Sequence, residues 1–162
     1  MYPDEDPSGQ AWAKRKPSYG WLIFIAVCFV AAIVAGIIYL NRHNEALDRV
    51  VATAGRLTLE NDKGEDLKRV DRRGLPDVWY RVTLEEVPRD TQLSLTCEWV
   101  APDGRVVHTN RYQTNTIDKD IWPTHAHHRL SSESPTGTWT VRLLLKGREL
   151  HSKTFEVRDG PP

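Results

Sequence analysis

The sequence has 162 residues, with 22 Lys and Arg against 22 Asp and Glu, so its formal net charge is zero. This length leaves room for one modest domain beside any membrane-spanning segment. The balanced charge gives no support to nucleic-acid binding, which normally requires a basic stripe or patch. Only two cysteines occur, Cys28 in an apolar run and Cys97 in a strand-like run. We therefore expect no internal disulfide, and the absence of a Cys-x-x-Cys motif argues against a zinc ribbon or a thiol redox site.

The N-terminal tail, residues 1–20, combines three prolines with a switch from acidic to basic residues. Such a composition predicts disorder for the tail alone in water. Its basic residues Lys14, Arg15 and Lys16 come shortly before the apolar run, which predicts a cytoplasmic N-terminus and contact with the membrane interface. Trp12 is the residue of this tail best suited to fill a groove on a partner protein.

The central feature of the sequence is Trp21–Leu40, an apolar run without a charged residue or a proline. As a helix it would extend about 30 Å, the thickness of the hydrocarbon core of a bilayer. We predict a membrane-spanning helix with aromatic anchors at Tyr19 and Tyr39; the alternative, a buried core helix, would need more surrounding chain than the sequence offers. The run exceeds the apolar region of a removable signal peptide. The stretch Ile25–Cys28 resembles a lipoprotein box, but Val27 is too bulky for one, so we expect a permanent signal anchor.

One face of the predicted span carries small residues. Cys28, Ala32 and Gly36 recur every four residues, a spacing that lets a second helix approach closely. Together with Trp21, they are the predicted partner-contact residues of the span. Small residues are also common in spans without such a role.

A helical pattern continues after the span. Leu47, Val50, Val51 and Ala54 fall on one stripe, and Gly55 is a suitable helix stop. We predict a helical stalk over residues 41–55.

From Arg56 the apolar period changes to two, which predicts strands up to residue 158, interrupted by a charged loop over 61–74. Trp99 and Trp139 lie on the apolar faces of their strands and are the predicted core centre. Frequent Pro, Gly and Asp turns favour an all-β antiparallel sandwich over residues 56–158, followed by a short tail, 159–162. The predicted strands are Val78–Leu84, Gln92–Val100, Arg105–Gln113, His127–Ser131, Thr138–Lys146 and Glu149–Val157.

The last of these strands carry a recognisable pattern. It consists of Gly137, Trp139, Val141, Gly147, Leu150, Phe155 and Val157. With the preceding hairpin, this pattern resembles bacterial immunoglobulin-like or fibronectin-like modules over residues 78–158. The resemblance implies an immunoglobulin-like fold without implying an activity, because such modules serve many roles.

The densest polar cluster is Thr124–Arg129. His125 and His127 would share one face of a strand and, with His108 or His151, could ligate a transition metal. The alternative is a solvated loop or strand edge rich in histidine. No nucleophile, metalloprotease, P-loop or dinucleotide motif occurs, so we expect neither enzyme activity nor a cofactor.

These observations favour a non-catalytic accessory subunit of a larger bacterial membrane complex. The expected partners are the lipid bilayer and other integral membrane subunits, with no nucleic acid or small-molecule substrate. We expect a single-pass inner-membrane protein with a periplasmic sandwich, and by analogy a photosynthetic reaction centre–antenna or respiratory assembly. Two alternatives are an independent tethered module that binds a protein, glycan or metal, and a membrane-anchored enzyme or redox carrier.

Overall fold

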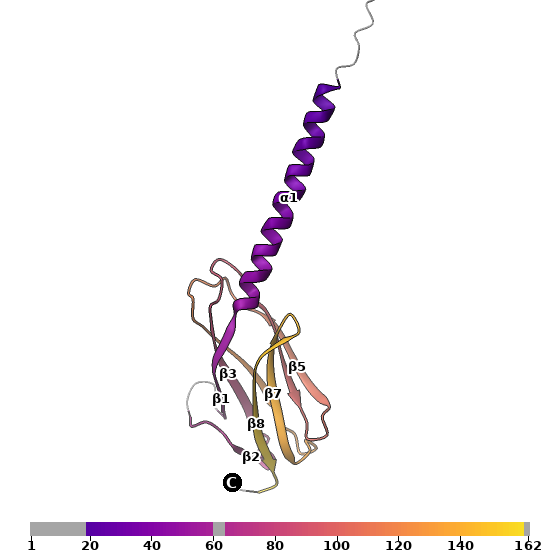
Figure 1. The fold of residues 1–162 in the computed structure, drawn as a ribbon. Coiled ribbons are helices and arrows are strands. Elements are labelled where there is room, and N and C mark those ends of the chain that lie inside the picture. The colour runs from indigo at the N-terminus through magenta and orange to yellow at the C-terminus, as the bar shows by residue number, and fades with distance from the viewer. Residues whose placement is uncertain (1–18, 60–63, 161–162) are drawn as a thin grey trace, which may run out of the picture. The chain divides into compact units, whose positions relative to one another are not determined.

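A single long helix, α1 (Gly20–Arg49), begins the part of the chain that the structure describes, residues 19–59 and 64–160 (Figure 1). In this computed structural model the chain divides into two units, residues 1–42 and 43–162. The apolar residues over 19–42, the described part of the first unit, are exposed, and none of the most apolar stretch of α1 is buried. This part of the helix has the length and composition of a membrane anchor or signal sequence.

The end of α1 corrects the predicted stalk. The helix stops at Arg49, and residues 51–58 form strand β1 (Val51–Thr58) instead of continuing the helix to residue 55. The cause is tertiary: β1 pairs antiparallel with β3 (Asp77–Glu85), from Val51 opposite Glu85 to Thr58 opposite Trp79. The stripe that we assigned to a stalk is therefore split between the last helical turn and a strand.

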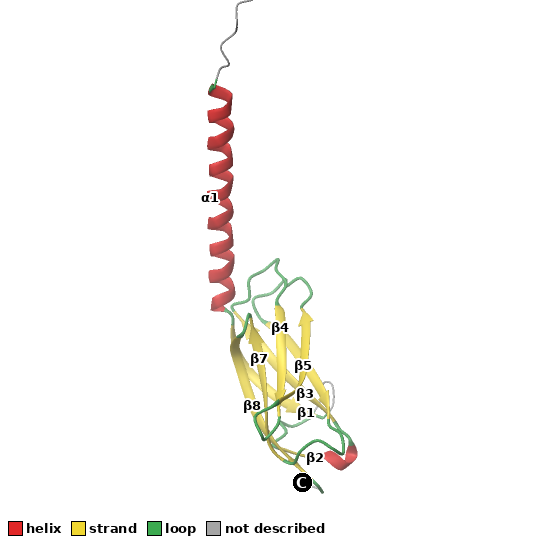
Figure 2. Cartoon of the chain, turned by 90° about the vertical axis from the view of Figure 1, so that its right-hand side faces the viewer, coloured by secondary structure: helices red, strands yellow, loops and turns green. Residues whose placement is uncertain are grey.

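Two sheets follow, drawn as strands in Figure 2. The three-stranded sheet has the order β1-β3-β6, with β6 spanning Trp122–Arg129. The five-stranded sheet has the order β2-β8-β7-β4-β5. Its strands are β2 (Arg69–Asp71), β4 (Ser94–Val100), β5 (Val106–Gln113), β7 (Gly137–Leu145) and β8 (Arg148–Arg158), and a short 3-10 turn, η1 (Arg72–Gly74), follows β2. All registered pairs are antiparallel except β2 with β8.

The predicted strands agree with β3, β4, β5, β7 and β8 to within two residues. The predicted strand His127–Ser131 was placed too late in the sequence, because β6 begins at Trp122, ends at Arg129 and pairs with β3 along its whole length. Pro123 and the exposed histidines hid the alternation that buries Thr124 and Ala126. The charged segment 61–74, predicted as a loop, contributes β2 and η1.

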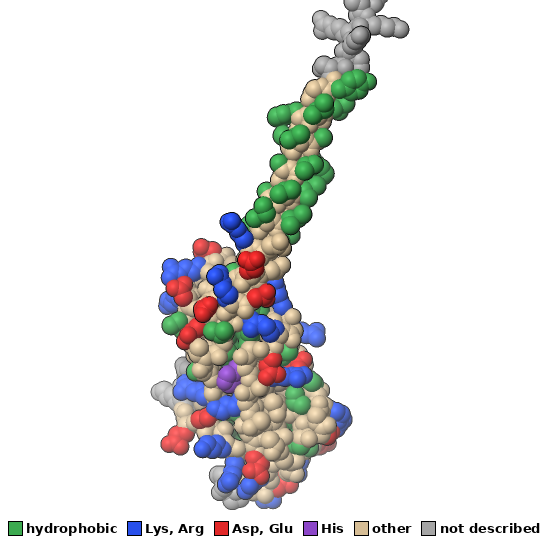
Figure 3. Space-filling view, in the orientation of Figure 1, with side chains coloured by type: hydrophobic (Ala, Val, Ile, Leu, Met, Phe, Trp, Pro, Cys, Tyr) green, Lys and Arg blue, Asp and Glu red, His purple; other side chains and the backbone are tan. Residues whose placement is uncertain are grey.

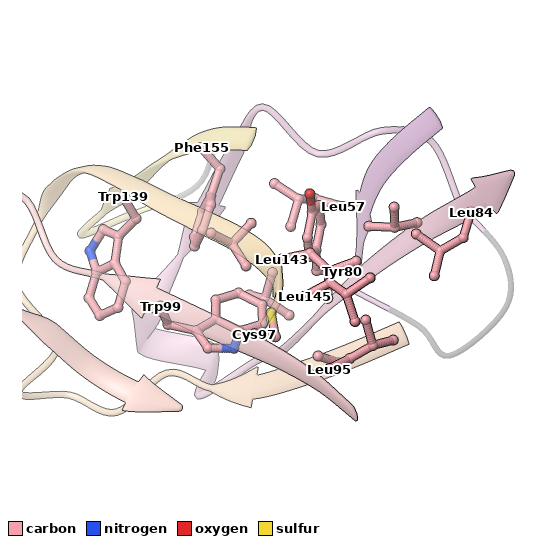
Figure 4. Close-up of a cluster of buried hydrophobic side chains, with 14 of the residues drawn as sticks. Leu57, Tyr80, Leu84, Leu95, Cys97, Trp99, Trp139, Leu143, Leu145 and Phe155 are labelled. Carbon is pink, nitrogen blue, oxygen red and sulfur yellow. The ribbon is translucent and has the colours of Figure 1, made fainter. Parts of the chain in front are cut away.

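The core lies between the two sheets, where alternate residues of each strand meet (Figure 4). Trp99 and Trp139 are both buried, which confirms their predicted place. Their indole N–H groups are satisfied by Asn110 Oδ1 and Pro135 O, each at 2.8 Å. Cys97 is buried and free, and burial raises the pKa of its thiol to about 12, so it packs as a small apolar residue.

Candidate functional site

The predicted contact residues of the helix are exposed. Trp21, Cys28, Ala32 and Gly36 all lie open in the first unit, and a Cβ built on Gly36 would meet nothing within 4 Å. Apolar side chains cover most of α1, whereas acidic and basic side chains mix on the visible face of the sandwich (Figure 3). The small-residue face can therefore accept a neighbouring helix without rearrangement of this chain.

The predicted interface residues fall in two groups. Tyr19 and Tyr39 are exposed to 66% and 71%, which suits aromatic anchors at the membrane surface. Trp12, Lys14, Arg15 and Lys16 lie outside the described residues.

The last turn of α1 belongs to the second unit, where it is fixed to the sandwich. Leu47 and Val50 are buried in the core. Arg148 Nη2 donates to the carbonyl oxygens of Leu47 at 3.3 Å and Val50 at 2.9 Å, and Lys146 Nζ donates to Asn44 Oδ1 at 2.6 Å. Basic side chains on the last carbonyls satisfy groups that a helix end leaves without intrahelical partners.

The histidines of β6 divide between two surfaces because successive strand residues face opposite ways. His125 and His127 lie on the outer face of the three-stranded sheet beside Trp79, with ring centroids 5.4 and 4.5 Å from the indole. His127 Nδ1 also lies 3.7 Å from Asp77 Oδ1.

His128 faces the interior of the sandwich instead. Its ring stacks on His108 at 4.7 Å and contacts Trp99 at 5.5 Å. Burial, followed by the neighbouring His108, lowers the pKa of His128 to about 4.

His125 and His127 lie beside Trp79, whereas His108 lies beside His128, so the three predicted metal ligands are not arranged around a common ion. Among the described residues, no group of three or more His, Cys, Asp or Glu side chains is placed to hold a metal ion. His128 points inward because side chains alternate between the two faces of β6. The predicted strand started too late, at His127, so the inward position of His128 was not found from the sequence.

A polar cluster joins β1 and β3 to β8 across the sandwich. The Tyr80 hydroxyl is hydrogen-bonded to His151 Nδ1 at 2.5 Å. Burial raises the pKa of Tyr80, and burial followed by the charge of Lys153 lowers the pKa of His151. The His151 ring occupies the place of a side chain at Gly55, since a Cβ there would lie 2.3 Å from His151 Cε1. Neither Gly55 nor His151 was singled out by its sequence pattern for this role.

Asp66 completes this side of the sandwich. Its Oδ1 accepts the backbone N–H of Leu57 at 3.0 Å, and its Oδ2 accepts Lys153 Nζ at 2.5 Å. Lys153 also donates to Gly55 O at 2.9 Å. Burial opposes ionisation of Asp66, but the bonds from Lys153 and Leu57 outweigh it and lower the pKa of Asp66.

The opposite side of the sandwich has an open groove between β5 and β6, with a volume of about 620 Å³. Residues 108–115 form one wall, and residues 122 and 124–127 form the other. Side chains bridge the walls: Asn110 Nδ2 donates to His127 O at 3.2 Å, and the Tyr112 and Thr124 hydroxyls are 2.8 Å apart. No backbone pairing between β5 and β6 occurs in the described sheets.

Comparison with known proteins adds one fold relationship. No family model and no curated protein sequence matches the chain. The chain is similar in structure to an immunoglobulin-like protein from Pseudomonas aeruginosa, with a TM-score of 0.50 and 16% identity over 68% of this chain and 97% of that one. A weaker likeness, with a TM-score of 0.48 and 15% identity, covers 67% of this chain and 30% of an alkylpurine DNA glycosylase from Pseudomonas fluorescens and carries no argument. The first match shows an immunoglobulin-like β-sandwich and, at this identity, nothing beyond the fold.

Proposed function

We propose that this chain is a non-catalytic accessory subunit of a larger bacterial membrane protein complex, held in the membrane by α1 as a permanent single-pass anchor. The observation that carries the proposal is the exposed apolar surface of α1 before residue 42, with the small residues Cys28, Ala32 and Gly36 on one face. A helix with such a face can pack closely against another span, gaining van der Waals contact that lipid tails do not supply.

The state of the reactive groups in the sandwich supports a structural role. Tyr80 and His151 bond to each other, and Asp66 and Lys153 form an ion pair. The high pKa of the buried Cys97 thiol leaves little thiolate for nucleophilic attack. These groups stabilise the fold, and the large exposed surfaces that remain are suited to contacts with other proteins.

The orientation follows from the basic residues of the tail. By the positive-inside rule, Lys14, Arg15 and Lys16 favour a cytoplasmic N-terminus, and the proposal therefore has the sandwich in the periplasm. Photosynthetic reaction centre–antenna and respiratory assemblies are the two classes proposed by analogy, and identification of the co-purifying subunits distinguishes them.

The test is affinity purification of the tagged full-length chain from native membranes in mild detergent, followed by sizing and protein identification. We expect the parent chain to migrate with a large membrane complex. Gly36→Leu should reduce recovery of the complex about tenfold, corresponding to about 1.4 kcal/mol of lost helix packing. Val34→Leu is the matched control, because it adds bulk on the opposite face of α1, and it should leave recovery unchanged.

Two results would contradict the proposal. Equal recovery with Gly36→Leu and Val34→Leu would show that the small-residue face is not a contact surface. Migration of the parent as a lone 18.5 kDa chain in its micelle would instead favour an independent tethered binding module, the second candidate, which the groove between β5 and β6 supports.

A further inference from the structure

The two sheets have four outer edges, and exposed edges normally carry a device that prevents pairing with another chain. The β1 edge is covered by this chain itself. Leu57 donates its N–H to Asp66 Oδ1 at 3.0 Å and accepts from Leu67 N at 2.9 Å, and Gly55 O accepts from Lys153 Nζ at 2.9 Å. A foreign strand would have to displace all three bonds.

Two other edges are also poor templates. Strand β2 has three residues, too few for a stable added ladder. Strand β6 contains Pro123, which has no N–H to donate and marks a blocked edge. Strand β5 differs from both, because it has eight residues and contains neither proline nor lysine.

The register shows which groups β5 offers. Thr114 donates its N–H to Leu93 O at 3.0 Å at the end of the β4–β5 ladder. Because bonding alternates along an antiparallel pair, Thr109, Arg111 and Gln113 turn their N–H and C=O groups away from β4, toward the free edge. Among the described residues, β5 pairs with β4 alone, so this row of backbone groups has no strand partner there.

The groove along β5 has a distinct chemistry. Of the described residues that line it, none is Asp or Glu, whereas Arg111 is present together with His108, His125 and His127, the three predicted metal ligands. Arg111 is exposed, and its side chain forms no ion pair within the described chain. Tyr112 and Trp122 add aromatic surface. The groove is therefore complementary to an extended ligand that carries negative charge and has free backbone hydrogen-bonding groups.

We propose that β5 captures an extended acidic peptide segment of another protein as a ninth strand of the sandwich. The added strand pairs its backbone with Thr109, Arg111 and Gln113, and a carboxylate lies beside Arg111. Val107, which is 43% exposed, offers an apolar neighbour on the same outer face. This inference goes beyond the proposed function, because peptide capture requires neither a second span nor a membrane complex.

The test is fluorescence anisotropy with the purified full-length chain in detergent micelles. The probe is a labelled, end-blocked peptide of about eight residues, matched to the length of β5, in which valine and glutamate alternate. We expect saturable binding, at least tenfold tighter than that of a peptide in which valine and lysine alternate. Methylation of every second backbone nitrogen in the acidic peptide, on the edge that would face β5, should abolish binding while its charge stays the same.

Two variants locate the site. Thr109→Pro removes one outward N–H and should weaken binding at least tenfold, whereas the matched Thr109→Val keeps that N–H and should bind as the parent does. Arg111→Glu should reverse the preference between the acidic and basic peptides. Near-UV circular dichroism checks that each variant is folded.

Three results would overturn the inference: no saturable binding of the acidic peptide, undiminished binding of its methylated form, or binding by a folded Thr109→Pro variant equal to that of Thr109→Val. Binding of the methylated peptide is measured with the parent chain, so the test remains decisive if Thr109→Pro does not fold. All of these measurements use the isolated chain, and their outcome is independent of the co-purification test above.

Discussion

Gly55→Ala is the most direct test of the junction between β1 and β8. The added Cβ would lie 2.3 Å from His151 Cε1 and 2.7 Å from His151 Nδ1. The imidazole of His151 must therefore move. Its Nδ1 is hydrogen-bonded to the Tyr80 hydroxyl at 2.5 Å, so the movement breaks this bond. Tyr80 is 1% exposed, so water cannot replace the lost partner without opening the sandwich.

The expected cost follows from these contacts. A buried hydroxyl left without its partner costs about 1–3 kcal/mol. Replacement of glycine by alanine restricts the unfolded chain and returns about 0.4–1 kcal/mol when the backbone tolerates it, and Gly55 is not among the positive-φ glycines. We expect Gly55→Ala to lower the free energy of unfolding by about 1–2 kcal/mol.

A double-mutant cycle isolates the cause. His151→Ala removes the ring that the new methyl group would strike, so Gly55→Ala made in that background should be neutral or stabilising by about 0.4–1 kcal/mol. The assay is urea unfolding of the full-length chain in detergent, followed by near-UV circular dichroism of the core aromatic residues. Gly74→Ala is the matched control, because a Cβ there meets nothing within 4 Å.

An equal loss of stability from Gly55→Ala in the parent and in the His151→Ala background would refute this reasoning. The glycine would then be required for its own backbone and not for the space that His151 occupies. A loss at Gly74→Ala as large as that at Gly55→Ala would show that the assay reports helix and turn propensity instead of the contact.

Two further predictions concern the sandwich. The folded-state pKa of His128 is lowered from 6.5 to about 4, so the unfolded chain binds a proton first, and stability falls as the pH drops from about 6.5 to 4. The loss in the free energy of unfolding is at most about 3 kcal/mol and is smaller after solvent screening. His128→Gln should flatten this part of the stability–pH curve, whereas His125→Gln, at an exposed position, should not. Arg148→Met should lower the free energy of unfolding by about 1–2 kcal/mol, because it removes the donor to Leu47 O and Val50 O. Hydrogen exchange should show faster amide exchange at residues 47–51 and no such change in β4. Unchanged exchange at the helix end would contradict this role of Arg148.

The strand predictions succeeded where one face of a strand is buried and the other is not. In β4 and β7, Cys97, Trp99, Trp139 and Val141 alternate with partly exposed residues, so a period of two was visible. Strand β6 was placed too late because its exposed positions carry Pro123 and histidines, while the residue that fills the interior at its end is also a histidine, His128. In that strand polar residues fill inward positions, so the alternation of burial is not visible as an alternation of apolar and polar residues.

The predictions of a helical stalk over 41–55 and of a histidine metal site were wrong for a related reason. Val50 and Val51 continue a helical stripe, but pairing of β1 with β3 ends the helix at Arg49. His125, His127 and His108 all line the groove between β5 and β6. The first two pack beside Trp79 and His108 stacks on His128, so their rings do not converge on one ion. Each outcome depends on a strand from a distant part of the sequence.

The sequence by itself determined the apolar helix, the change of period after it and the two tryptophans at the centre of a β-sandwich. These features follow from local composition and alternation, which are properties of the chain before it folds. Only the tertiary structure decided that Gly55 makes room for His151, that His128 points inward, and that the edge of β5 stays open while Asp66 and Lys153 cover that of β1. The physical reason is that a side chain's neighbours across a sandwich are set by strand order and register, and single-residue patterns carry no record of either.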